Sequence, residues 1–291
     1  MELTVHTPAM RFVLVHYHIF KNAGSTLEWI FRREFRDAFA TLHSEDANAA
    51  LGTGHLRRCL KDNPALKAVS SHHLRYPMGG IPGTVLFDCC FLRHPLRRLQ
   101  SMYEHFRRAE EDDWISALAR RESAGGFMKT LLEGWPHLVS NVQTLYLSTG
   151  GAFTRPAGVL DFQKALDTVQ RMAFPGVVEQ FDESLVAAEY FLRPAFPGLH
   201  LDYIAQNVSA PRADVDGKSL IELWGSELHG QLVRLNRYDL RLVERTTKEV
   251  RRRTSLVPEF PARLDDFRGR CAALQPEGAP VSYSPSDPSR H

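Results

Sequence analysis

The sequence predicts an α/β protein with three layers, a central and largely parallel β-sheet, and a helical C-terminal portion. Short apolar runs of strand-forming residues alternate with longer segments whose apolar residues recur at helical spacing. The run at 85–92 is almost continuously apolar, which is typical of a strand covered on both faces of a parallel sheet. The 291 residues are 43% hydrophobic and 24% charged, which is the composition of a folded globular protein.

The N-terminal third contains three predicted strands, at 11–19, 67–71 and 85–92. A helix is expected after the first strand, because apolar residues there recur every three or four positions (Leu27, Ile30, Phe31 and Phe35). A second helix is expected to begin at Pro95, because the first position of a helix does not need an N–H group. Strand, loop and helix therefore follow one another twice.

Beyond residue 150 the pattern predicts one more strand and a series of helices. The strand is predicted at 176–181, and the helices at 162–172, 183–192, 219–232 and 238–253. Residues 275–291 are rich in Pro and Ser and predict a disordered tail. We therefore expect one domain over 1–274.

Charge, cysteine content and hydropathy exclude several classes of protein. The 36 basic residues nearly balance the 34 acidic ones, which argues against a nucleic-acid coat protein or a polybasic membrane binder. The four cysteines show no CxxC spacing and predict a reduced, cytoplasmic setting. No stretch approaches the roughly 18 apolar residues of a membrane span, and the N-terminus does not resemble a signal peptide.

The loop after the first strand carries groups that suit a phosphate. It reads Lys21-Asn22-Ala23-Gly24-Ser25-Thr26 and leads into a helix N-terminus, where N–H groups and the helix dipole favour an anion. It is not a Walker A loop, in which the lysine follows the glycines. The alternative interpretation is an ordinary helix start that is capped by Ser25, with Lys21 in solvent.

A second basic site follows the third strand. Arg93 stands at the strand end and Ser101 lies eight residues later in the next helix. Ligands of open α/β sheets bind outside the carboxyl ends of the strands, where an arginine can hold a phosphate through two hydrogen bonds. The positive charges of Arg93, Arg97 and Arg98 lie near the positive end of the helix dipole, which is unfavourable, and a bound anion would offset this repulsion. The alternative is a solvated first turn.

The two motifs together resemble those of sulfotransferases that use 3′-phosphoadenosine 5′-phosphosulfate (PAPS). Four further segments resemble the carbohydrate sulfotransferase branch of that family and occur in the same order: Ser71-His72, 141–144, 178–185 and 235–240. The resemblance runs from about Phe12 to Arg253. It implies a three-layer, P-loop-like sulfotransferase fold. Two departures are Phe20, where proline is frequent, and Asn22, where threonine is usual.

The resemblance also implies roles for particular residues. The loop of Lys21, Asn22, Ala23, Gly24, Ser25 and Thr26 would bind the 5′-phosphosulfate, and Arg93 with Ser101 the 3′-phosphate. Lys21 would stabilise the leaving phosphate at the bridging oxygen. No metal is expected to assist the donor. Thr26 and Ser25 would add hydroxyl donors to those of the backbone.

Two histidines, His72 and His73, end the second strand and are candidates for the general base. A histidine suits this task near neutral pH. Neighbouring side chains of an extended segment point to opposite faces, so one of the two is expected to face the donor, and His72 matches the family position better. The alternative is a packed or surface histidine, with Glu179 as the next candidate base. A zinc site at His16 and His18 is disfavoured because no Cys, Asp or Glu accompanies them at ligand spacing.

The predicted function is transfer of a sulfuryl group from PAPS to an acceptor hydroxyl, most naturally that of a carbohydrate. A nucleotide-dependent kinase and a non-catalytic nucleotide- or polysaccharide-binding protein of the same fold are the alternatives. Animal enzymes of this type carry a membrane anchor, and its lack here predicts a cytoplasmic, bacterial enzyme. No nucleic-acid partner is expected. The acceptor and the oligomeric state are left open by the sequence.

Overall fold

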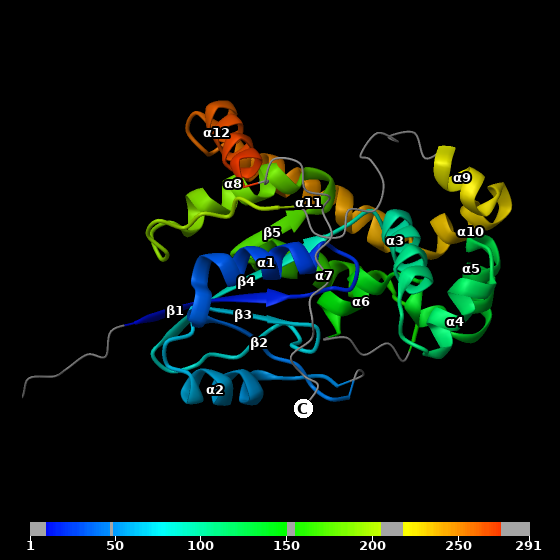
Figure 1. Ribbon diagram of the computed structural model, residues 1–291, viewed down its shortest axis with the longest axis horizontal. Helices are drawn as coiled ribbons and strands as arrows, with labels where there is room; N and C mark the ends of the chain where they lie inside the picture. The colour runs from blue at the N-terminus through cyan, green and yellow to red at the C-terminus, as the bar shows by residue number, and fades with distance from the viewer. Residues whose placement is uncertain (1–9, 47–48, 150–154, 205–217, 275–291) are drawn as a thin grey trace, which may run out of the picture.

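The computed structural model describes residues 10–46, 49–149, 155–204 and 218–274. Five parallel strands form one sheet in the order β2-β3-β1-β4-β5 (Figure 1). They are β1 (Arg11–Tyr17), β2 (Phe39–Thr41), β3 (Ala68–Ser71), β4 (Thr84–Leu92) and β5 (Phe174–Val177). The prediction of an α/β protein with a central parallel sheet is confirmed.

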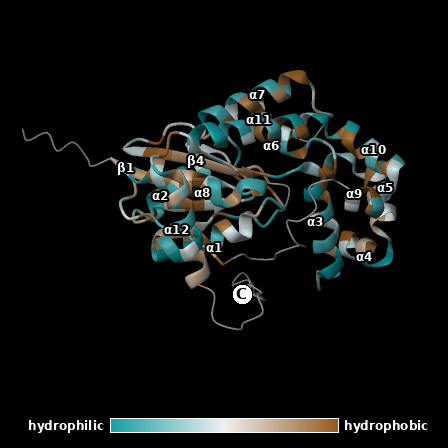
Figure 2. Ribbon diagram, turned by 90° about the horizontal axis from the view of Figure 1, so that it is seen from above, coloured by the Kyte–Doolittle hydropathy of each residue, from teal (hydrophilic) through white to brown (hydrophobic). Residues whose placement is uncertain are grey.

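Helices cover both faces of this sheet. Val13 and Val15 of β1 pack with one set of helices, whereas Leu14 between them packs with the other set, as the alternation of a strand requires. The first set is α2 (Thr53–Asp62), α6 (Val142–Ser148), α7 (Val159–Arg171) and α11 (Arg237–Thr254). The second is α1 (Gly24–Phe35), α8 (Phe181–Leu192) and α12 (Phe260–Ala273). Figure 2 shows largely hydrophobic strands β1 and β4 among helices in which hydrophilic and hydrophobic residues alternate.

A third core belongs to helices that lie beyond the carboxyl ends of the strands (Figures 1 and 2). We call these helices the helical lobe: α3 (Pro95–Arg108), α4 (Trp114–Arg121), α5 (Ala124–Gly134), α9 (Lys218–Trp224) and α10 (Ser226–Leu235). The helical character predicted for the C-terminal portion is confirmed over 218–273. No helix among the described residues is both long and apolar enough to cross a membrane.

Two predicted elements differ from those observed. The fourth strand is Phe174–Val177 and not 176–181, because a short 3₁₀ turn (Val178–Gln180) precedes α8. Pro175 is tolerated there because β5 is an edge strand. The helix predicted at 219–232 is two helices, since Gly225 adopts a positive φ of 78° between them.

Six elements were absent from the sequence prediction, namely β2, α2, α4, α5, α6 and α12, and two further 3₁₀ turns span Arg36–Ala38 and Pro136–Leu138. The predicted tail at 275–291 lies outside the described residues. The prediction of one domain over 1–274 stays a prediction.

Candidate functional site

The loop between β1 and α1 has an unusual backbone. Lys21 and Ala23 adopt positive φ angles of 66° and 61°, which non-glycine residues rarely do. Between them, the buried Asn22 donates its side-chain amide to the Phe91 carbonyl and to Gln143 Oε1, both at 2.8 Å. Asn22 therefore fixes the loop against β4, a positioning role that the sequence did not reveal.

The start of α1 is open. Its N-cap residue is Ala23, whose side chain cannot cap the helix, so the alternative of a helix capped by Ser25 is wrong. Ser25 is exposed and Thr26 is buried. Gly24 is required by a close approach, since a Cβ atom there would lie 1.8 Å from His18 Nε2. First-turn N–H groups without a cap, at the positive end of a helix dipole, can bind an anion.

Lys21 is the cation of this loop. Burial, together with the positive charges of Arg93 and Arg108, lowers the pKa of its ammonium group to about 8, although the charge of Glu104 acts in the opposite direction. Its Nζ atom lies 5.6 Å from the centre of the Phe20 ring. Within the described part of the chain Lys21 forms no ion pair. A bound anion would supply the missing negative charge.

The second motif is joined directly to the first. Arg93 Nη1 donates to the Lys21 carbonyl at 3.1 Å. The backbone of Arg93 is held by the side chain of Gln143, which accepts from its N–H at 2.9 Å and donates to its carbonyl at 2.8 Å. Gln143 thus clamps both loops, because its Oε1 atom also accepts from Asn22. The two predicted phosphate motifs lie side by side.

Gln143 is itself held by a buried carboxylate. Asp239 of α11 accepts from the Gln143 N–H at 3.1 Å, and from the N–H and hydroxyl of Thr144, both at 2.7 Å. Asn141 receives the N–H groups of Tyr238 and Asp239 on its side-chain oxygen. The segments 141–144 and 235–240, which carry the family resemblance, therefore form one buried polar network behind the loops.

The three arginines of the second motif have different surroundings. Arg98 is 1% exposed, donates to the Leu138 carbonyl at 3.2 Å and is attracted by the charge of Asp239. Arg97 contacts Gln100 and Ser219. The argument that all three charges need an external anion is therefore wrong for Arg98, which has an internal carboxylate. Arg93 is the arginine beside Lys21.

Ser101 lies in α3 and is 3% exposed. Its predicted contact with a 3′-phosphate would require the hydroxyl to become accessible, so of the proposed phosphate contacts it has the least support. Its assignment stays a prediction.

His72 and His73 follow β3 in a bend and not in the extended backbone that the sequence argument assumed, because Ser71 Oγ accepts hydrogen bonds from the N–H groups of His73 and Leu74. His72 Nδ1 lies 3.0 Å from the carbonyl oxygen of His18, so Nδ1 carries the proton and Nε2 keeps a lone pair. The ring stacks on that of His18 with centroids 3.6 Å apart. Burial and the neighbouring His18 lower the pKa of His72 to about 3, so the imidazole is neutral at neutral pH but is a weaker base than an ordinary histidine.

His73 is buried, and its ring lies 6.1 Å from that of His43, which also neighbours His72. Its Nδ1 atom accepts from the N–H of Ser44 at 3.3 Å, which ties the residue to the segment after β2. This contact gives His73 a structural task and favours His72 as the residue that faces the site.

A metal-ligand set that the sequence did not show lies beneath the loop. One ligand atom each of His16, His18 and Glu28 lie within 4.8 Å of one another. These groups also bond internally: His18 Nδ1 lies 2.8 Å from Glu28 Oε1, and Ser70 bridges His16 and Glu28 at 2.9 and 2.8 Å. Glu28 comes from α1, and only the fold brings it beside the two histidines.

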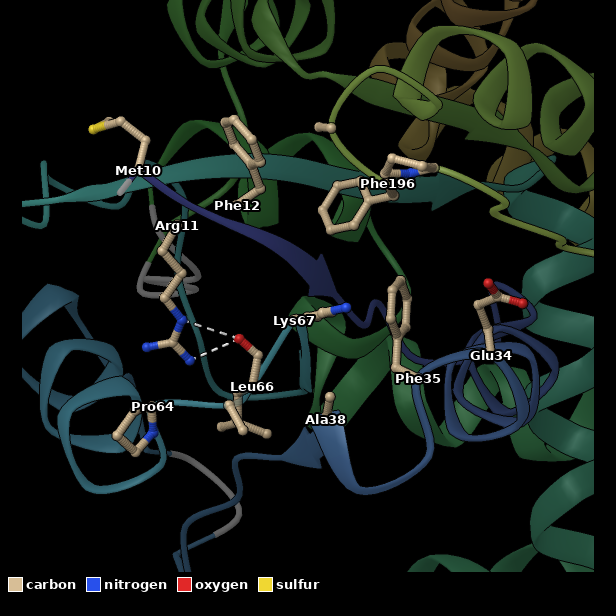
Figure 3. A pocket seen from close by; sticks show the side chains of 13 residues that line it. Met10, Arg11, Phe12, Glu34, Phe35, Ala38, Pro64, Leu66, Lys67 and Phe196 are labelled. Atoms are coloured by element: carbon tan, nitrogen blue, oxygen red, sulfur yellow. Dashed lines mark hydrogen bonds between the residues drawn. The ribbon is translucent and has the colours of Figure 1, made fainter. Parts of the chain in front are cut away.

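A cavity of about 480 Å³ lies at the opposite edge of the sheet (Figure 3). Arg11 and Phe12 open β1 and Lys67 precedes β3, so this cavity faces the amino ends of the strands. The Arg11 guanidinium donates hydrogen bonds to the carbonyls of Leu60, Asn63 and Leu66. None of the predicted site residues lines this cavity.

Comparisons with known proteins assign no activity. No protein-family model matches the chain. An uncharacterized protein of Archaeoglobus fulgidus is 25% identical to it over 244 residues, which cover 81% of this chain and 96% of that protein. The similarity therefore extends over most of both chains.

Proposed function

We propose that this protein is a PAPS-dependent sulfotransferase of P-loop-like fold that transfers a sulfuryl group to a hydroxyl, in the first place that of a carbohydrate. The observation that carries the proposal is the pair of basic loops that Gln143 holds together. Lys21 and Arg93 lie side by side at the carboxyl edge of a parallel sheet, where open α/β proteins bind ligands. A donor with a 5′-phosphosulfate and a 3′-phosphate has one anionic group for each loop.

The first loop would hold the reacting end of the donor. The open N-terminus of α1 offers N–H groups to a phosphosulfate, and the buried Lys21 ammonium offers a charge. A desolvated cation interacts more strongly with developing charge than one in water. Lys21 would therefore act mainly as the bridging oxygen becomes negative.

The reaction balances without a metal. The acceptor oxygen forms a bond to sulfur while the bond between sulfur and the bridging oxygen breaks, and adenosine 3′,5′-bisphosphate leaves with that oxygen. The acceptor proton goes to His72 Nε2, whose lone pair is free because Nδ1 faces a carbonyl oxygen. As in phosphoryl transfer, positioning and electrostatics supply most of the catalysis.

A titration by calorimetry tests the donor. We expect adenosine 3′,5′-bisphosphate to bind without magnesium, and more tightly than Mg-ATP. A preference for Mg-ATP would favour the kinase alternative and contradict the proposal. Binding of the bisphosphate without transfer of labelled sulfate to any of a broad set of sugars, alcohols and amines would favour the non-catalytic alternative.

A further inference from the structure

Two tryptophan rings stack on each other at the surface of the helical lobe. Trp114, the first residue of α4, and Trp135, which follows α5, have ring centroids 4.2 Å apart and an interplanar angle of 28°. They are 48% and 38% exposed. Large aromatic side chains usually bury their surface, so an exposed pair marks a surface for binding.

The segment before Trp114 lies near the part of α3 that adjoins Lys21. Phe20, next to Lys21, packs on His105 of α3 with ring centroids 5.4 Å apart. The charges of Lys21, Glu111 and Asp113 all act on the His105 imidazole. Asp113 directly precedes Trp114 and caps α4 by accepting a 2.7 Å hydrogen bond from the Ser116 N–H. Trp114 is therefore connected to Lys21 through Phe20, His105 and Asp113.

The apolar surface here is small. Among the described residues of α4, α5 and the following 3₁₀ turn, only Trp114 and Trp135 are large apolar side chains that are exposed. Two rings suit the flat C–H face of a sugar, whereas a stable protein interface buries roughly 1,200 Å² or more. A protein partner is thus the less favoured occupant.

Carboxylates border the pair. Glu110, Glu111, Asp112 and Asp113 precede Trp114, and Arg120 fixes this segment by donating to the carbonyls of Ala109 and Glu111. Carboxylate oxygens accept hydrogen bonds from sugar hydroxyls and repel sulfate or uronate groups. The surroundings therefore favour an uncharged sugar over an anionic one.

We infer that Trp114 and Trp135 form a platform that binds an uncharged oligosaccharide, the acceptor chain whose hydroxyl reaches the site at Lys21. The inference rests on the proposed function, which it deepens by naming the acceptor class.

The test measures sugar binding by the intact protein without donor, using calorimetry and saturation-transfer NMR. The probes are hexasaccharides of β-1,4-glucose, α-1,4-glucose and β-1,4-N-acetylglucosamine, and a heparin hexasaccharide. We expect at least one neutral hexasaccharide to bind, and Trp114→Ala or Trp135→Ala to weaken it about tenfold or more. Trp114→Tyr, which keeps an aromatic ring, should weaken sugar binding less. Phe191→Ala removes an aromatic side chain of α8 that is as exposed as Trp135, and it should leave sugar binding unchanged.

Three results would contradict the inference: no neutral hexasaccharide binds, the heparin hexasaccharide binds more tightly than the neutral ones, or both alanine variants bind the neutral hexasaccharide as tightly as the wild type does. A change of oligomeric state in the alanine variants, with sugar binding intact, would assign the pair to a protein contact instead. Unchanged melting temperatures show that the variants fold. Bisphosphate affinity is measured on the same samples, so a protein that binds the sugar through Trp114 but not the bisphosphate would contradict the proposed function and leave the platform standing.

Discussion

The basic residues at the amino ends of the strands differ in burial and in hydrogen bonding from those at the carboxyl ends. At the amino ends of the strands, Lys67 and Arg11 line a cavity of about 480 Å³. Lys67 is exposed, and the Arg11 guanidinium donates hydrogen bonds to the carbonyls of Leu60 and Leu66. At the carboxyl edge Lys21 is partly buried and its pKa is lowered to about 8. Its loop is clamped to Arg93 through Gln143.

The candidate site is thus distinguished by a buried cation on a fixed loop and not by cavity volume. A cation in water interacts weakly with a ligand, whereas a desolvated cation on a fixed loop interacts strongly and is already positioned. The carboxyl ends of the strands have a desolvated cation on a fixed loop, whereas the amino ends have a cavity whose lysine is exposed. Four predictions test this contrast.

The largest effect is expected at the two lysines. Lys21→Ala should lower kcat roughly thousandfold, because the charge acts when the bridging bond breaks, and should weaken bisphosphate binding much less. Lys67→Ala, the matched change at the amino edge, should leave both within about twofold. Steady-state kinetics and calorimetry measure the two quantities. Equal losses in both variants would abolish the contrast between the edges.

A smaller effect is expected at the end of β3. His72→Ala should lower kcat roughly a hundredfold with bisphosphate affinity retained, since a general base is lost. His73→Ala should affect thermal stability instead, because His73 Nδ1 bonds the Ser44 N–H. An inactive His73→Ala enzyme beside an active His72→Ala enzyme would reverse the assignment of the base.

The third effect concerns affinity. Arg93→Ala should weaken adenosine 3′,5′-bisphosphate by about 2 kcal/mol, or roughly thirtyfold, because a charged hydrogen-bond donor to phosphate is lost. Arg97→Ala is the control, since Arg97 contacts Gln100 and Ser219 at the surface of α3. Normal binding by a folded Arg93→Ala variant would show that the second motif holds no phosphate.

The fourth effect is a pH dependence. Because the pKa of Lys21 is about 8 in the protein, its charge is lost as the pH rises through 8, well below the ordinary value of 10.5. Bisphosphate affinity should therefore fall about tenfold between pH 7 and pH 9. Lys21→Arg keeps its charge and should abolish this decrease. An affinity that stays constant to pH 9 in the wild type would contradict the lowered pKa.

The sequence predicted the parts of the site that are local and missed those that depend on distant contacts. Lys21 and Arg93 lie in loops that follow strands and Gly24 begins the helix after the first of these loops, so the alternation of strands and helices alone places them at the carboxyl ends of parallel strands. The clamp of Gln143 on Asn22 joins residues 121 positions apart, which no local pattern reveals. The same holds for Glu28, which only the docking of α1 brings to His16 and His18.

The errors in the fold have physical causes too. Strand β5 includes Pro175 and Gly176, which are poor strand formers, so the sequence favoured the branched residues that follow. Gly176 is nevertheless required, since a Cβ atom there would lie 2.4 Å from the Phe91 ring. Tertiary packing overrode local propensity at this strand.

The buried network also fixes an order of assembly. Asp239 holds Gln143 in place, and Gln143 holds the loops at Asn22 and Arg93, so residues at both ends of the described chain must meet before the loops are tied. Contacts of such long sequence separation form late in folding, because the chain between them must first be ordered. On the ribosome, the sheet strands all emerge before α11 does. The two loops can therefore be tied to each other through the Asp239–Gln143 contact only after α11 has docked.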